Sequence, residues 1–218
     1  MLPIIRIEKE HWLKDTFARS GSSSDVLREP NEQFASLTKD HKDKIRQTQI
    51  EAEEIIRILG FYEAHALIMK WDGVIGWLPK EIFTIDKSIS ELSPPRSQKL
   101  SPSNFFEAWK GIRYVWGGVT KTGIDCSGLT QRYYLDVHNK VIAKNSRDQR
   151  KSGQSKNLAF IADHDLVFCT RLRGSGVHHV GVFFEGLVWH AQSDKGVISQ
   201  ALNEFLRMYS VEEVVSLI

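Results

Sequence analysis

Short apolar runs separated by polar and turn residues dominate the first half of the chain. Residues 54–59, 64–70 and 74–78 are each rich in apolar side chains. Runs of this length between turn signals are typical of β-strands, and several closely spaced strands favour a small β-barrel. Residues 31–49 are polar by contrast and predict a long loop with at most a helical turn.

The second half of the chain mixes helical and strand patterns. A short helix is predicted over residues 103–110, with Ser103 as its N-cap and Gly111 ending it. A longer helix is predicted to begin at Cys126, because apolar positions recur every four residues after it, at Leu129, Tyr133 and Val137.

Three strand-like runs follow these helices, at residues 165–169, 177–184 and 187–191. Only Glu185-Gly186 separates the last two, which is a signal for a two-residue hairpin turn. A helix followed by an antiparallel sheet predicts an α+β fold.

A change in composition separates the two halves. Residues 88–103 contain three of the six prolines and six serines, a composition typical of a linker. We therefore expect a first domain at residues 1–90, a linker at 91–103 and a second domain at 104–218.

Bulk charge and composition exclude several classes of partner. Lys and Arg total 29 and Asp and Glu total 27, which gives no basic surface for nucleic acid or an anionic membrane. The apolar residues at the N-terminus are interrupted by Arg6, so we see no signal peptide and expect a cytoplasmic monomer. The chain has only two cysteines, which we expect to stay reduced in that compartment.

Cys126 is the first candidate for chemistry, because it lies at a predicted helix start with Asp125 as N-cap. The positive end of the helix dipole and the free backbone N–H groups there favour the thiolate. We therefore expect a lowered pKa for this thiol. A lone cysteine is more often a buried apolar residue, and on this pattern alone that alternative stays open.

The predicted hairpin brings two histidines together. If Glu185-Gly186 is a two-residue turn, Gly181 lies opposite His190, and His179 becomes a diagonal neighbour of His190 on the same sheet face. One imidazole could then orient the other as a base for a thiol. His178 points to the opposite face and is expected at the surface.

The other candidate ligands suggest no further site. Cys169 closes a strand and is interpreted as a buried structural thiol, and the remaining histidines lack ligand spacing. A metal site needs more well-placed ligands than Cys126 and the hairpin histidines provide, so we expect neither metal nor cofactor.

These residues fall within motifs that together resemble the NlpC-type (NlpC/p60) family of cell-wall cysteine peptidases. In order, they are Tyr114-Val115-Trp116-Gly117-Gly118, Asp125-Cys126-Ser127-Gly128-Leu129, Asn145-Ser146-Arg147-Asp148-Gln149, Asp165-Leu166-Val167-Phe168, His179-Val180-Gly181-Val182 and Trp189-His190-Ala191. They span residues 105 to about 205. The first half resembles the bacterial SH3-like domain that often precedes such domains, through residues 46–49 and 72–79.

The resemblance implies a papain-like catalytic domain that cleaves peptidoglycan stem peptides, typically between γ-D-glutamate and a diamino acid such as meso-diaminopimelate. Cys126, His179 and His190 match the family's catalytic positions. Tyr114, Asp125 and Ser127 match positions lining the cleft, where Asp125 would hold the free amine of an N-terminal L-alanine. The sequence departs from the family pattern at residues 162–165 and in the loop at 171–176.

Several functional questions stay open at this point. A silent cell-wall-binding protein and a thiol acyltransferase on the same fold are alternatives to a peptidase. Because no signal peptide is seen, we expect the substrates to be turnover fragments in the cytoplasm rather than the intact wall. This favours a role in cell-wall recycling. The SH3-like domain is expected to limit the substrate rather than to recruit the enzyme to the wall.

Overall fold

The structure, a computed structural model, describes all residues except 1–7, 31–38 and 173–177. The undescribed residues include the N-terminal segment in which we saw no signal peptide. They also include parts of the loops expected at 31–49 and 171–176. The chain forms two compact units, Met1–Arg96 and Ser97–Ile218, so their boundary falls inside the expected linker.

The first unit is built on a seven-stranded antiparallel sheet with the strand order β3-β2-β6-β5-β4-β1-β7. Its strands are β1 (Phe17–Ser20), β2 (Ser24–Leu27), β3 (Arg46–Ile50), β4 (Ile55–Tyr62), β5 (His65–Met69), β6 (Ile75–Pro79) and β7 (Phe83–Ile85). Helical segments are η1 (Lys9–His11), α1 (Lys39–Ile45) and η3 (Lys80–Ile82). Apolar residues from both sides of the sheet, including Ile58, Ile68 and Trp77, are buried.

The three strand predictions for this unit are confirmed as β4, β5 and β6, but two other expectations differ. Within the range 31–49, where a loop was expected, residues 39–45 form α1 and residues 46–49 belong to β3. The strand forms because Arg46 and Thr48 pair with β2 and are buried despite their polarity. The SH3-like barrel is not confirmed. Among the described residues the outer strands β3 and β7 are not paired with each other, and β2 meets β6 at only Leu27 and Trp77.

The second unit has a six-stranded antiparallel sheet with the order β10-β15-β11-β12-β13-β14. The strands are β10 (Gln154–Lys156), β11 (Leu166–Arg171), β12 (His178–Phe184), β13 (Leu187–Gln192), β14 (Gly196–Ala201) and β15 (Tyr209–Ser216), and a separate pair is β8 (Val119–Thr120) with β9 (Gly123–Ile124). The helices are α2 (Pro102–Trp109), α3 (Cys126–His138), α4 (Ser146–Arg150), η4 (Leu158–Phe160) and α5 (Leu202–Met208). The α+β expectation is confirmed for this unit.

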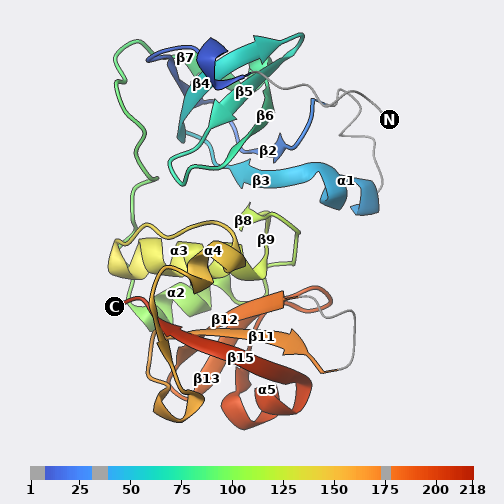
Figure 1. Cartoon of the computed structure of the whole chain (residues 1–218), viewed down its shortest axis with the longest axis vertical. Helices are drawn as coiled ribbons and strands as arrows, with labels where there is room; N and C mark the ends of the chain where they lie inside the picture. Colours follow the sequence, from blue (N-terminus) through green and yellow to red (C-terminus); the bar gives the residue numbers. More distant parts are fainter. Residues whose placement is uncertain (1–7, 31–38, 173–177) are drawn as a thin grey trace. The chain divides into compact units, whose positions relative to one another are not determined.

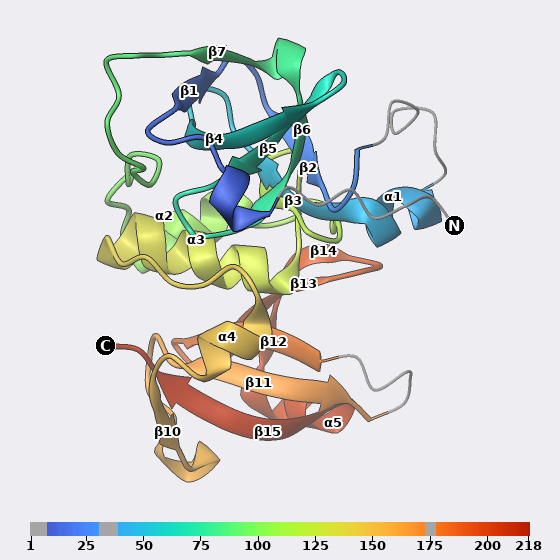
Figure 2. The same ribbon diagram turned by 45° about the horizontal axis from the view of Figure 1, so that its top comes forward.

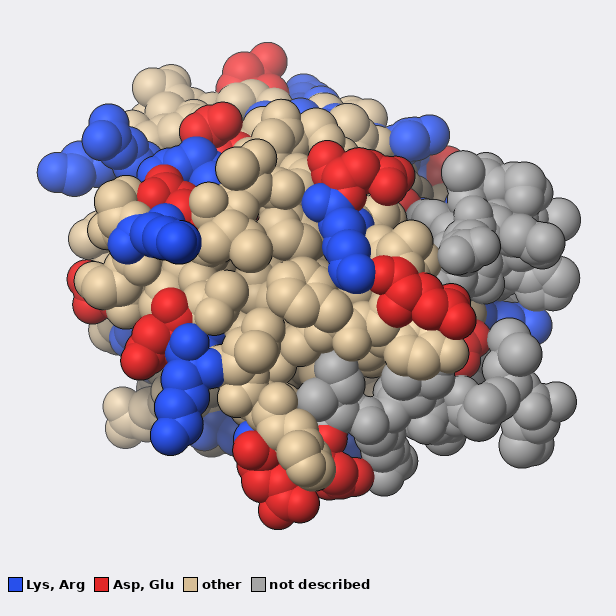
Figure 3. Space-filling model, turned by 90° about the horizontal axis from the view of Figure 1, so that it is seen from above, with Lys and Arg blue, Asp and Glu red and all other residues tan. Residues whose placement is uncertain are grey.

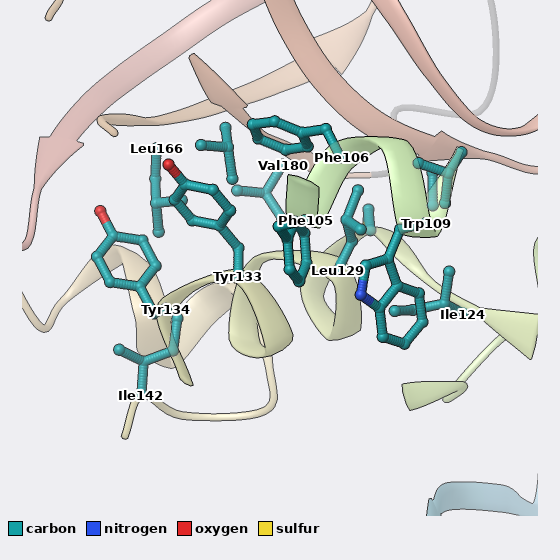
Figure 4. Close-up of a cluster of buried hydrophobic side chains, with 14 of the residues drawn as sticks. Phe105, Phe106, Trp109, Ile124, Leu129, Tyr133, Tyr134, Ile142, Leu166 and Val180 are labelled. Carbon is teal, nitrogen blue, oxygen red and sulfur yellow. The ribbon is translucent and has the colours of Figure 1, made fainter. Parts of the chain in front are cut away.

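Helices cover both faces of this sheet, with α3 on one face and α5 on the other (Figures 1 and 2). The α3 face holds the larger core, in which Phe106 stacks between Tyr133 and Trp189. Figure 4 shows the side chains of α2 and α3 meeting in this core. The α5 face holds a smaller cluster that includes Cys169, Phe205 and Tyr209. A cysteine at the start of α3 is therefore carried by a well-packed helix.

Local sequence signals explain where the helices begin. Asp125 caps α3 and accepts a hydrogen bond from the Gly128 N–H, as predicted. The first helix begins earlier than predicted, because Ser101 rather than Ser103 accepts the capping bond from the Asn104 N–H and Pro102 starts the helix.

The predicted hairpin and its register are confirmed. Phe184 pairs with Leu187, and the turn residues Glu185 and Gly186 both have positive φ, at 50° and 78°, as a two-residue type I′ turn requires. His190 faces Gly181 closely: a Cβ placed on Gly181 would lie 3.2 Å from the His190 Cβ. The turn thus sets which side chains of β13 face those of β12.

The surface carries both charge signs. On the face shown in Figure 3, Lys and Arg are interspersed with Asp and Glu outside the grey atoms, and no single sign covers a large area. No helix among the described residues has the length and apolar character needed to cross a bilayer.

We predict that Gly181→Ala destabilises the second unit. The new methyl group would lie 2.7 Å from Val188 Cγ1 and 2.9 Å from the Trp189 carbonyl oxygen, so β13 must shift. Overpacking of this kind costs about 1–3 kcal/mol in the free energy of unfolding, measured by urea titration. Gly186→Asn is the control, because a Cβ at this position has no neighbouring atom within 4 Å and asparagine tolerates positive φ. Equal stability of both variants would show that the strands do not approach this closely.

Candidate active site

Cys126 is the first residue of α3 and lies against β12, one of the two central strands of the sheet. Only 9% of the residue is exposed. Its sulfur accepts hydrogen bonds from the backbone N–H groups of Val180 and Ser127. Val180 directly follows His179 on β12, so the thiol lies beside the strand that carries the predicted base.

The two predicted histidines are in direct contact. His179 Nε2 and His190 Nδ1 are 2.7 Å apart, and the rings meet edge to face with centroids 5.0 Å apart. His190 is fully buried, and its Nε2 lies 2.9 Å from the side-chain oxygen of Gln200 on β14. The structure therefore brings the predicted pair together, while the catalytic role of each residue stays a prediction.

Tyr209, at the start of β15, holds the plane of the His179 ring. The two rings stack with centroids 5.4 Å apart and an angle of 15° between planes, and Phe205 also stacks on Tyr209, with centroids 4.4 Å apart. Neither aromatic residue was predicted from the sequence, because nothing in their spacing links them to a histidine on β12.

The Asp125 carboxylate is the most heavily bonded group of the site. Besides capping α3, it accepts from the Gly117 N–H at 2.8 Å and from the Ser127 hydroxyl at 3.1 Å. The buried ammonium of Lys144 donates to both of its oxygens, at 2.9 and 3.0 Å. Sequence reasoning missed Lys144; its position just before the Asn145–Gln149 motif was the available signal.

The residues expected to line the substrate cleft have defined places. Ser127 is buried and accepts a hydrogen bond from Lys144 at 3.2 Å. Tyr114 is half-buried and forms an isolated bridge with Ile124, two residues before Cys126. Their substrate contacts, and that of Asp125, stay predictions. The structure gives Asp125 and Ser127 internal partners, which the sequence did not suggest.

The expectation of a lowered thiol pKa is wrong for this structure. Burial, and after it the negative charge of Asp125, raise the pKa of the Cys126 thiol to about 12. The Val180 N–H, the Lys144 ammonium and the Ser127 N–H act in the opposite direction, but burial dominates. The helix start supplies donors, as expected, yet the resting group is a neutral thiol.

Both histidines are neutral near pH 7 as well. Burial, and to a smaller extent His190 and the charge of Arg171, lower the pKa of His179 to about 3. Burial also lowers the pKa of His190 to about 4, although the hydrogen bond that its Nε2 makes to the Gln200 oxygen acts to raise it. A neutral imidazole beside a neutral thiol can act as a base, since its free nitrogen lone pair can take the thiol proton.

The remaining candidates lie outside this constellation. His178 is exposed and approaches Glu212 at 3.5 Å, as its predicted face implies. Cys169 is buried in the α5-side cluster. His164 Nδ1 bonds the Tyr133 hydroxyl at 2.6 Å. Across the described residues, no group of three or more His, Cys, Asp or Glu side chains could hold a metal ion.

We predict that alkylation of Cys126 accelerates with rising pH. Because burial raises the pKa of its thiol to about 12, the reactive thiolate becomes more populated at every step upward from neutrality. The rate of iodoacetamide labelling, followed by mass spectrometry, should rise steadily between about pH 6 and about pH 9. Cys169 is 1% exposed and should label much later. A rate independent of pH in this range would show a thiolate already formed at rest.

We predict that Lys144→Met is strongly destabilising, because it leaves the buried Asp125 carboxylate without its cation. Breaking a buried pair costs about 3–5 kcal/mol in the free energy of unfolding, measured by urea titration. Adding Asp125→Asn should recover part of that loss. The control is Lys151→Met, which changes an exposed lysine. An unchanged unfolding free energy in the Lys144 variant would contradict the ion pair.

Comparison with known proteins finds similarity over the region that holds this site. Residues 111–214 match the profile of the NlpC/P60 family. The murein DD-endopeptidase MepS/murein LD-carboxypeptidase of Escherichia coli is 36% identical over 97 residues, 44% of this chain and 50% of that protein. The gamma-D-glutamyl-L-lysine dipeptidyl-peptidase of Bacillus cereus is 30% identical over 113 residues, 51% of this chain and 33% of that protein. The chain thus covers half or less of the length of these relatives.

A solved structure agrees in fold. An NlpC/P60 family protein from Bacillus cereus superposes with a TM-score of 0.72, covering 92% of this chain and 99% of that one at 15% identity. At this identity the likeness concerns the fold alone. Residues 111–214 are therefore similar to the NlpC/P60 family, both in the family model and in the curated relatives.

Proposed function

We propose that this chain is a cysteine peptidase of peptidoglycan stem peptides, with Cys126 as nucleophile, His179 as base and His190 as the residue that orients the base. The observation that carries the proposal is the Cys126 thiol held beside β12, where His179 is bonded to His190 at 2.7 Å. The names of the relatives from Escherichia coli and Bacillus cereus support the substrate class.

The proposed reaction starts from neutral groups. As the Cys126 sulfur attacks the scissile carbonyl carbon, its proton passes to the free nitrogen of His179, which becomes an imidazolium. That proton then goes to the leaving amine, and the carbon–nitrogen bond breaks to leave an acyl group on the sulfur. Water, deprotonated by His179, hydrolyses the thioester and restores the thiol.

The bond we propose is the one between γ-D-glutamate and a diamino acid such as meso-diaminopimelate. The name of the Bacillus cereus relative supports this choice, since it specifies a γ-D-glutamyl bond. The name of the Escherichia coli relative specifies a DD bond instead. We further propose that the peptide carries a free N-terminal L-alanine, as expected of fragments in cell-wall recycling.

We predict that the full chain cleaves L-Ala-γ-D-Glu-meso-diaminopimelate, with products identified by mass spectrometry. Cys126→Ala should abolish cleavage. His179→Ala should lower kcat/KM by about 10²–10⁴-fold, because it removes the base. His190→Asn should retain more activity, because an amide can still accept a hydrogen bond from His179. His178→Ala, on the exposed side of the strand, is the matched control and should cleave normally.

Two further substrates test the finer assignments in the same assay. An N-acetylated peptide should be cleaved far more slowly than the free amine, and a DD-crosslinked peptide dimer should stay intact. Cleavage of the dimer alone would reassign the bond. A folded chain that binds these peptides and cleaves none of them would indicate a silent wall-binding protein.

A further inference from the structure

A line of polar side chains crosses three neighbouring strands on the α5 face of the sheet. His179 on β12 is diagonal to His190 on β13, because Gly181 lies opposite His190. Gln200 on β14 is diagonal to His190 in turn, because Val188 pairs with Gln200 and His190 pairs with Ile198. Diagonal neighbours on one face are within reach of long side chains, so the register connects all three groups.

Hydrogen bonds join this line from end to end. His179 Nε2 lies 2.7 Å from His190 Nδ1, and His190 Nε2 lies 2.9 Å from Gln200 Oε1. Gln200 Nε2 donates to the sulfur of Met208, the last residue of α5, at 3.3 Å. Each nitrogen of His190 thus has a single defined partner.

Met208 determines which way the Gln200 amide points. A thioether sulfur can accept a hydrogen bond but cannot donate one, so the NH₂ group of Gln200 belongs on the Met208 side. Turning the amide over would place its oxygen against the sulfur, acceptor against acceptor, and lose this bond. The carbonyl oxygen of Gln200 therefore faces His190.

The positions of the imidazole protons follow from that orientation. A carbonyl oxygen only accepts, so His190 Nε2 must carry a proton. A neutral imidazole has a single N–H, which leaves His190 Nδ1 as an acceptor, and His179 Nε2 must then be the donor to it. The same reasoning leaves His179 Nδ1 without a proton, as the free base nitrogen. Burial, which lowers the pKa of both histidines, keeps both rings in the neutral form that this reasoning requires.

We propose that Gln200, oriented by Met208, is a positioning residue that sets the tautomers of His190 and His179, so that Nδ1 of His179 is the atom that takes the Cys126 proton. The proposal rests on the proposed function in assigning Cys126 as the nucleophile. When Nδ1 takes that proton, His179 becomes an imidazolium whose Nε2–H still donates to His190, and no proton leaves His190. With the opposite tautomers, an N–H would face the thiol and could not accept its proton.

The test reads the tautomers directly, without substrate. The full chain is labelled with ¹⁵N-histidine, and long-range ¹H–¹⁵N spectra distinguish Nδ1–H from Nε2–H imidazoles. Variants His179→Gln and His190→Gln assign the two sets of signals. We expect both rings in the Nε2–H form at neutral pH. An Nδ1–H form of either ring in the unmodified chain overturns the proposal.

Two variants test whether Gln200 sets the imidazole tautomers or only fills space beside His190. Gln200→Met keeps the shape but removes the acceptor, and Met208→Leu keeps the volume but releases the amide. Both should populate the Nδ1–H form of His190 and His179, because His190 Nε2 then no longer has a fixed acceptor. Ser199→Ala, on the other face of β14, is the control and should leave the histidine signals unchanged.

Unchanged tautomers in both variants would overturn the role of Gln200. If Gln200→Met does not fold, the spectra of the unmodified chain and of Met208→Leu still decide the question. Expected tautomers in a chain that cleaves none of the peptides would leave this inference standing and refute the proposed function instead.

Discussion

The Asp125 carboxylate is the constraint on which the rest of the site depends. It caps α3, holds the backbone at Gly117 and pairs with the buried Lys144 ammonium. These bonds fix the first turn of α3 against the preceding loop, and so they fix the place of Cys126. A buried carboxylate is tolerated only when donors surround it, which explains why a lysine with 3% of its surface exposed accompanies it.

The same burial decides the protonation of the reacting groups. A thiol at a helix start in water would favour the thiolate, but here burial dominates and raises the pKa of Cys126 to about 12. Burial lowers the pKa of His179 to about 3, so no ion pair forms at rest. In the proposed reaction, the proton moves from Cys126 to His179 only as the sulfur attacks. A bound substrate then excludes water, and His190 can stabilise the new imidazolium of His179.

The two faces of the sheet of the second unit have different roles. One face packs on α2 and α3 and carries the aromatic core that anchors the helix of the nucleophile. The other face packs on α5 and carries the line from His179 through His190 to Gln200, flanked by Tyr209 and Phe205. Because β12 belongs to both faces, it is the element at which the thiol and the histidines meet.

By itself the sequence determined the features that depend on near neighbours in the chain: the Asp125 cap, the start of α3 and the Glu185-Gly186 turn with its histidine pair. These follow from local backbone geometry, in which a turn of known length fixes the register. Only the tertiary structure decided that Lys144, Gln200 and Tyr209 join the site, that β3 and β7 stay unpaired among the described residues, and that the Cys126 thiol is neutral. Partners brought together by packing leave no local pattern, and burial, which sets the pKa, is a property of the whole fold.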